Sequence, residues 1–208
     1  MFIERLMQNF NKDEPIFTDE IIELFHDYSR SQVFHFIENA KEKKEIIQYC
    51  KGVYYIPHIT ILNTLSTISV DSIVKKRYLF NKNEIYGIYS GIKLLNTLSI
   101  TTQRPSVVEI VTNKETTKYR KIVINERNYI LRKSRCEINK NNYKAYMIMQ
   151  YFNDLACNEK LSNSAKRHLI SFIKKQNIKT NEIFDMALYF PTKAKKNLME
   201  SGIINEIV

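Results

Sequence analysis

The stretch IIQYCKGVYYIP, residues 46–57, consists of two short runs of strand character around Cys50-Lys51-Gly52. β-Branched and aromatic side chains predominate in both runs, and glycine suits a tight turn between antiparallel strands. Pro57 cannot donate a further ladder hydrogen bond, so it ends the second run. The sequence therefore predicts a basic hairpin with strands at 46–49 and 53–56.

The residues before this hairpin carry helical patterns. A first helix is expected from residue 2 to about residue 11, followed by a short extended piece after Pro15. Thr18 is expected to cap a second helix, and Ser29 with Gln32 matches a capping box that starts a third helix ending near residue 43 or 44. The apolar stripe of this third helix is expected to comprise Val33, Phe36, Ile37 and Ala40.

Helix, short strand, helix, turn, helix and hairpin, in this order, are typical of a winged helix-turn-helix, so we predict such a domain at residues 1–57. In this fold the third helix enters the major groove of DNA, where Gln and Asn can bind adenine, and the wing contacts the backbone. The residues expected to contact DNA are Ser29, Arg30, Ser31, Gln32, His35, Asn39, Lys43, Lys51 and Tyr54. Glu38 and Glu42 share the helix face and would repel phosphates, so a winged helix used for protein contact is the alternative.

The rest of the chain, residues 58–208, predicts a domain of strands and helices. Residues 58–65 are interpreted as a linker, Ser69 as the cap of a helix, and residues 87–98 as a loop with a helix that begins near Ser90. Residues 105–113 and 120–134 have strand composition, and residues 142–157 have that of a long helix. Two or three further helices form a tail from about residue 160. The expected fold class is α+β.

Basic residues concentrate in the middle of this chain, which has a formal net charge of +10. Residues 1–57 contain 7 Lys and Arg against 10 Asp and Glu, whereas residues 58–135 contain 14 against 5. A solvated sheet face in a lysine-rich chain is one interpretation, and an anion-binding surface for flanking DNA or an RNA-like partner is the other. The residues assigned to that surface are Lys75, Lys76, Arg77, Gln103, Arg104, Lys118, Arg120, Arg132, Lys133 and Arg135.

Motifs for catalysis and cofactor binding are absent from the sequence. There is no GxGxxG, no GxxxxGK[ST], no GxSxG and no His or Cys pair at zinc spacing. Asp154 stands at a predicted helix end, where solvation accounts for it. We therefore expect no enzymatic activity, no cofactor and no metal. Three scattered cysteines, no secretion signal and no long apolar run predict a cytoplasmic protein without a membrane span.

Three short motifs in the sequence resemble a known family. The wing KGVYYIP contributes Gly52, Tyr54, Tyr55 and Pro57; the segment GIYSGIKLLNTLSITTQRP contributes Gly91, Leu95, Thr101, Thr102, Gln103 and Pro105; and Thr112 and Asn113 form the third motif. Over residues 1–155 the chain resembles the AbiEi-like antitoxins of type IV toxin–antitoxin systems. It departs from their pattern at Cys50, where a basic residue is usual, and at Ser99, where glycine is usual.

The resemblance implies a DNA-binding transcriptional autorepressor that binds double-stranded repeats in its own promoter. It also implies an antitoxin that counteracts a nucleotidyltransferase-like toxin in abortive phage infection, and leaves open whether the two form a direct complex. A winged-helix protein adaptor without DNA binding, and an RNA-binding protein that uses the basic middle region, are the alternatives.

Overall fold

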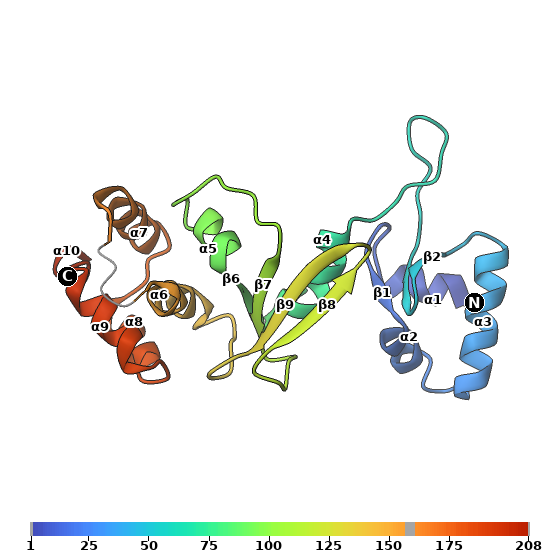
Figure 1. Ribbon diagram of the computed structural model, residues 1–208. Coiled ribbons are helices and arrows are strands. Elements are labelled where there is room, and N and C mark those ends of the chain that lie inside the picture. Colours follow the sequence, from blue (N-terminus) through green and yellow to red (C-terminus); the bar gives the residue numbers. More distant parts are fainter. Residues whose placement is uncertain (1, 157–160, 208) are drawn as a thin grey trace. The chain divides into compact units, whose positions relative to one another are not determined.

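The computed structural model describes residues 2–156 and 161–207, which form two compact units, one up to Lys76 and one from Arg77 onward. The class is α+β, as predicted: a three-stranded sheet among helices in the first unit, and a two-stranded and a mixed four-stranded sheet with C-terminal helices in the second (Figure 1). Cys157 and Glu159 lie outside the described residues.

The first unit contains the elements in the predicted order. Helix α1 (Phe2–Asn9), strand β1 (Ile16–Phe17), helices α2 (Thr18–Leu24) and α3 (Arg30–Glu42), and the hairpin strands β2 (Ile47–Cys50) and β3 (Val53–Tyr55) follow one another. The strands form an antiparallel sheet in the order β1-β3-β2, which is the arrangement of a winged helix-turn-helix. Gly52 has a φ of +76°, as the turn between β2 and β3 requires.

The caps predicted for α2 and α3 differ in outcome. The capping box at α3 is confirmed, because the Gln32 N–H donates to Ser29 Oγ at 3.3 Å and the Ser29 N–H donates to Gln32 Oε1 at 3.0 Å. Thr18, by contrast, is not the cap of α2 but its first helical residue. The Phe17 N–H donates to the Glu20 carboxylate at 2.8 Å, so a side chain in the first turn satisfies the cap position.

The first unit extends past the predicted boundary at Pro57 because β3 is buried on both faces. Tyr54 and Ile56 belong to the core that the three helices enclose. Val53 and Tyr55 point the other way and pack against residues of the following segment, including Ile73 in helix α4 (Val70–Val74). A sheet with two apolar faces needs a cover on each, and the chain after Pro57 supplies the second one.

The connection after Pro57 is a projecting loop rather than a plain linker (Figure 1). Thr60 and Thr64 exchange backbone and hydroxyl hydrogen bonds, and the Ser66 N–H donates to the His58 carbonyl at 2.9 Å. At the base of the loop, Asp13 accepts hydrogen bonds from Ser66 Oγ and His58 Nδ1. Apolar side chains at its tip are exposed, with Ile61 and Leu62 the most open to solvent.

The second unit is built on a four-stranded sheet in the order β6-β7-β9-β8. Its strands are β6 (Gly87–Ser90), β7 (Val108–Thr112), β8 (Arg120–Ile124) and β9 (Arg127–Lys133), and the pair β7–β9 is parallel. A π-helical turn η1 (Lys75–Leu79) and the small hairpin of β4 (Phe80–Asn81) and β5 (Glu84–Ile85) precede the sheet. The prediction of a loop at residues 87–90 was wrong, because these residues form β6, which pairs with β7. Only glycine fits at position 87, because an added Cβ would lie 2.0 Å from the Tyr78 carbonyl oxygen.

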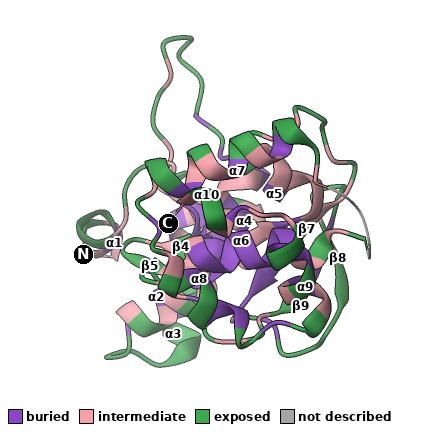
Figure 2. Ribbon diagram, turned by 90° about the vertical axis from the view of Figure 1, so that its left-hand side faces the viewer, coloured by how far each residue is buried: buried purple, intermediate pink, exposed green. Residues whose placement is uncertain are grey.

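Helix α6 (Tyr143–Asp154) is the centre of this unit's core. It packs against helix α5 (Gly91–Thr97), strand β6 and two tail helices, α8 (Thr180–Ala187) and α9 (Thr192–Glu200). Every residue from 145 to 152 is buried (Figure 2), as expected of a helix that is apolar on all sides. Helices α7 (Asn163–Lys175) and α10 (Ile204–Ile207) contact each other and complete the predicted helical tail.

Candidate nucleic-acid interface and polar cleft

The outward face of α3 displays most of the residues that the sequence assigned to DNA contact. Arg30, Ser31 and His35 are exposed, whereas Asn39 is half-buried. Ser29 and Gln32 are exposed as well, but their side chains hold the capping box. Because Val33, Ile37 and Ala40 face the core, the opposite face of α3 is open to solvent, as a recognition helix requires.

The charge on this face is less acidic than the residue count suggests. Lys41 Nζ donates to both carboxylate oxygens of Glu38, at 3.0 and 2.8 Å, so the nearest acid is neutralised locally. Glu42 and Lys43 are exposed at the C-terminal end of the helix. The Arg30 guanidinium lies 5.9 Å from the centre of the Phe34 ring and remains on the surface.

Of the two wing residues that the sequence assigned to DNA contact, only Lys51 is exposed. Lys51 is exposed at the hairpin turn, and the Gly52 carbonyl accepts from the Thr18 N–H at 3.1 Å, which ties the turn to the start of α2. The assignment of Tyr54 to DNA contact was wrong. Tyr54 is 5% exposed, because the alternation along β3 directs its side chain into the helical core.

Lys76 was wrongly assigned to the anion-binding surface. Its ammonium group lies 2.9 Å from a carboxylate oxygen of each of Glu14 and Glu20, donates to the Pro15 carbonyl at 2.7 Å, and sits over the Phe10 ring. Burial alone would raise the pKa of Glu14, but the hydrogen bonds from Lys76 and Asn11, together with the charge of Lys76, outweigh it, and this pKa is lowered. Lys76 is therefore a buried structural cation.

The neighbouring cations have different surroundings. Lys75 forms an exposed ion pair with Asp71 at 2.6 Å, one helical turn away, and Arg77 is an exposed residue. The continuous basic cluster that the sequence suggested at residues 75–77 does not form, because successive residues of a helix point in different directions.

Two arginines of the β8–β9 hairpin are paired with carboxylates of their own unit. Arg120 Nε donates to Glu115 at 2.7 Å, and Arg132 donates to Glu109 through two nitrogens at 3.1 and 3.0 Å. Burial by itself raises the pKa of Glu115, yet hydrogen bonds from Thr117 and Arg120 outweigh it, so the pKa lies below its ordinary value. Both arginines therefore carry less free positive charge than the sequence implied.

In the second and third motifs of the family resemblance, Asn96, Thr112 and Asn113 form hydrogen bonds within the second unit. Asn113 accepts from Ser134 Oγ and the Ile138 N–H, both at 2.9 Å, and donates to the Ile138 carbonyl. Thr112 is fully buried and donates to the Tyr86 carbonyl. The Asn96 amide donates to the Thr101 and Gln103 carbonyls, which shapes the loop after α5 and leaves the Gln103 and Arg104 side chains exposed.

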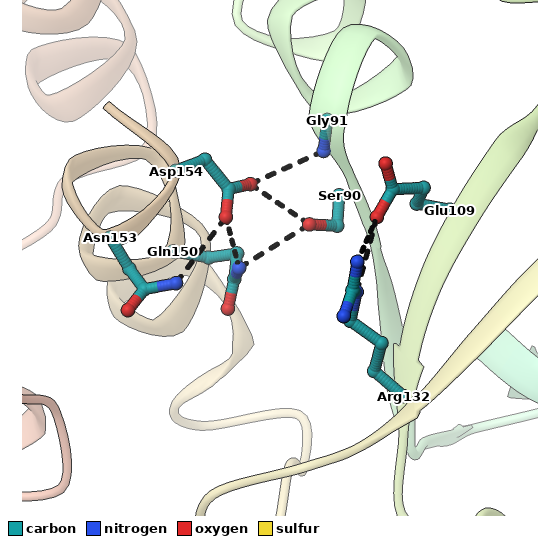
Figure 3. A network of polar contacts seen from close by, with 7 residues as sticks. All are labelled: Ser90, Gly91, Glu109, Arg132, Gln150, Asn153 and Asp154. Atoms are coloured by element: carbon teal, nitrogen blue, oxygen red, sulfur yellow. Dashed lines mark hydrogen bonds and ion pairs between the residues drawn. The ribbon is translucent and has the colours of Figure 1, made fainter. Parts of the chain in front are cut away.

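The second unit contains a polar cleft of about 820 Å³ between the sheet and α6. Strand β7 contributes Glu109 and Val111, and α6 contributes Tyr146, Gln150, Asn153 and Asp154. The basic wall consists of Lys118, which precedes β8, and of Arg132, Lys133, Ser134 and Arg135 at and after the end of β9. Figure 3 shows the α6 residues on one side and the Glu109–Arg132 pair on the other. Four of the predicted anion-binding residues thus line one concave surface.

A carboxylate network holds one side of the cleft together. Asp154 accepts from Ser90 Oγ at 2.9 Å, from the Gly91 N–H at 3.2 Å and from the Gln150 amide at 2.7 Å (Figure 3). Ser90 and Gln150 are buried, so the network fixes the junction of β6 and α5 against α6. Gly91 has a φ of +57°, and an added Cβ would lie 3.3 Å from Glu109 Oε1. Sequence reasoning missed this site, because it ascribed Asp154 to solvation at a helix end.

The chain belongs to DUF6088, a family of unknown function. Its family model matches residues 2–181, which cover all of the first unit and most of the second. A comparison with curated proteins finds no match.

Within residues 2–156 and 161–207, no three His, Cys, Asp or Glu side chains gather as metal ligands would. Across the same residues, the helices are too short or too polar to pass through a bilayer.

At the edge of the cleft, burial raises the pKa of Tyr146 to about 12, and its hydroxyl oxygen accepts from the Arg135 N–H at 2.9 Å.

Proposed function

We propose that this DUF6088 protein is a cytoplasmic DNA-binding transcriptional autorepressor and the antitoxin of a type IV toxin–antitoxin system. In this role it represses its own promoter and counteracts a nucleotidyltransferase-like toxin during abortive phage infection. The protein itself needs no catalytic residue, metal or cofactor for either task. The resemblance over residues 1–155 supports the antitoxin assignment, and the winged helix supports DNA binding.

The observation that carries the DNA-binding proposal is the outward face of α3. Arg30, Ser31 and His35 project from its first turns, where helix-turn-helix proteins contact base edges. Lys51 stands on the wing, where a cation contacts backbone phosphate. Pairing of Glu38 with Lys41 removes the nearest repulsive charge from this face.

The test is a salt series of binding to the DNA upstream of the protein's own gene, against a scrambled duplex of equal length. We expect the specific duplex to bind at least ~10³-fold more tightly. Arg30→Ala combined with His35→Ala should abolish this preference, and Lys51→Ala should weaken both duplexes alike, because it removes a backbone contact. Lys121→Ala, an exposed lysine of β8, is the matched control for loss of charge.

Equal binding of both duplexes, with only the salt dependence remaining, would contradict the repressor proposal. No duplex binding at all would favour the adaptor alternative, in which the α3 face contacts a protein. Preference for RNA that is lost with Lys118→Ala and Lys133→Ala, and kept with Arg30→Ala, would favour the RNA-binding alternative. The toxin partner is tested separately: the genes that flank this one are searched for a nucleotidyltransferase-like protein, and growth is measured when that protein is expressed with and without this chain.

A further inference from the structure

The cleft of the second unit has an uneven distribution of charge. Glu109 is paired with Arg132, and the Asp154 carboxylate receives hydrogen bonds from neutral donors. Lys118 and Lys133 are exposed on the basic wall of the cleft, across from α6, and among the residues that the structure describes neither ammonium has a carboxylate at ion-pair distance. The basic wall therefore has positive charge that no residue of the described chain neutralises.

Arg135 is held in position without losing its charge. Its Nη2 donates to the neutral Asn153 Oδ1 at 3.2 Å, and its guanidinium lies 5.3 Å from the centre of the Phe190 ring. Stacking and a neutral hydrogen bond orient the planar group while leaving other N–H donors for a ligand. A preorganised guanidinium beside two free ammonium groups is a favourable arrangement for phosphate.

We propose that this cleft binds the terminal phosphate of a nucleotide-sized ligand, with Lys118, Lys133 and Arg135 as the phosphate-binding residues. The volume of about 820 Å³ lies within the range of roughly 300–1,000 Å³ usual for small-ligand sites. A phosphate monoester carries up to two negative charges at one point, and three cations that line one cleft can match them. A duplex backbone distributes its charges along a line and needs an extended surface instead.

The other wall of the cleft determines what accompanies the phosphate. Asp154, Gln150 and Asn153 present carboxylate and amide groups from α6 (Figure 3). The Asp154 carboxylate repels phosphate, and although it accepts hydrogen bonds from Ser90, Gly91, Gln150 and Asn153, its exposed position suits hydroxyl or amino groups nearby. The ligand class that fits both walls has a phosphate at one end and a hydroxyl-bearing sugar or an amino-bearing base at the other. Such a group is present in a free nucleotide and at a phosphorylated RNA end.

This inference does not depend on DNA binding by α3, because it uses residues of the second unit alone. Calorimetric titration of the full chain would use inorganic phosphate, the four nucleoside 5′-monophosphates, the matching nucleosides, and one RNA oligonucleotide with a 5′-phosphate or a 5′-hydroxyl. We expect at least one phosphorylated ligand to bind, and its unphosphorylated counterpart to bind at least tenfold more weakly. Preference for the mononucleotide or for the phosphorylated RNA identifies the source of the phosphate.

The variants separate the cleft from general positive charge. Lys118→Ala with Lys133→Ala should weaken binding at least tenfold, and Arg135→Lys should weaken it by a smaller factor because the planar fork is lost. Lys121→Ala should bind as the unaltered protein does. The proposal is overturned if none of the phosphorylated ligands binds at millimolar concentration, if 5′-hydroxyl RNA binds as tightly as 5′-phosphate RNA, or if Lys121→Ala loses as much affinity as the cleft variants. Circular dichroism confirms that each variant is folded.

Discussion

Lys76 of the first unit and Lys133 of the second belong to clusters that look equivalent in sequence, yet their surroundings differ completely. Lys76 is buried between Glu14 and Glu20, and its ammonium group lies over the Phe10 ring. Lys133 is exposed on a cleft wall beside Lys118 and Arg135. The difference teaches that a run of basic residues predicts neither an anion site nor a structural role. What decides is whether carboxylates of the same unit reach the cations.

The largest expected effect comes from removing the buried cation. Lys76→Met keeps the apolar stem but leaves Glu14 and Glu20 without their shared partner, so the first unit should lose about 2–3 kcal/mol of its unfolding free energy. This is below the roughly 3–5 kcal/mol for fully buried pairs because both carboxylates retain some solvent contact. Chemical denaturation with hydrogen exchange on the first unit measures it.

Lys75→Met is the matched control at the adjacent position. Its exposed pair with Asp71 is worth about 0.5 kcal/mol or less. If both substitutions cost the same, Lys76 does not have the structural role described above.

Gly91→Ala tests whether the β6–α5 side of the cleft stabilises the second unit, in contrast to the basic wall, which is not expected to. A side chain at a φ of +57° is strained by about 1–2 kcal/mol, and the new Cβ would press against Glu109. Thermal unfolding of the second unit should shift downward. Lys93→Ala in the same helix should leave it nearly unchanged. An unaltered midpoint for Gly91→Ala would show that the β6–α5 junction tolerates a different backbone conformation.

Acidification should weaken both units, through Glu14 in the first and Glu115 in the second. Both carboxyls have lowered pKa values in the folded protein, so their contribution to stability is present above the unfolded pKa of about 4.3 and is lost as the pH falls through the folded pKa. We expect each contribution to be smaller than that of Lys76, because a protonated carboxyl keeps some hydrogen bonds. Denaturation from pH 6 to pH 3 should show a shallower slope for Glu115→Gln in the second unit alone.

The smallest expected effect on stability belongs to the cleft lysines. Lys118→Ala and Lys133→Ala should change the unfolding free energy by less than about 0.5 kcal/mol, as is usual for exposed side chains without a partner. A loss comparable to that of Lys76→Met would mean that these lysines stabilise the fold. The comparison between the two clusters would then fail.

Local signals in the sequence determined most of the elements of this protein. The Ser29–Gln32 capping box, the Gly52 turn and the apolar spacing of residues 143–152 act over a few residues, so the start of α3, the hairpin and α6 could be predicted from them. The α+β class followed from the order of these elements. Strand β6 escaped prediction because its four residues need β7 beside them to become a strand.

Only the tertiary structure decided which charged residues have an ion-pair partner and which aromatic residues are buried. Tyr54 is buried because the alternation along β3 directs its side chain into the core that the three helices enclose. Lys76 lies more than fifty residues from Glu14 along the chain, and Ser90 is similarly distant from Asp154. Sequence periodicity reports on neighbours within an element, whereas ion pairs and clefts are made by segments that only folding brings together. The fold class was therefore readable from the sequence, and the sites were not.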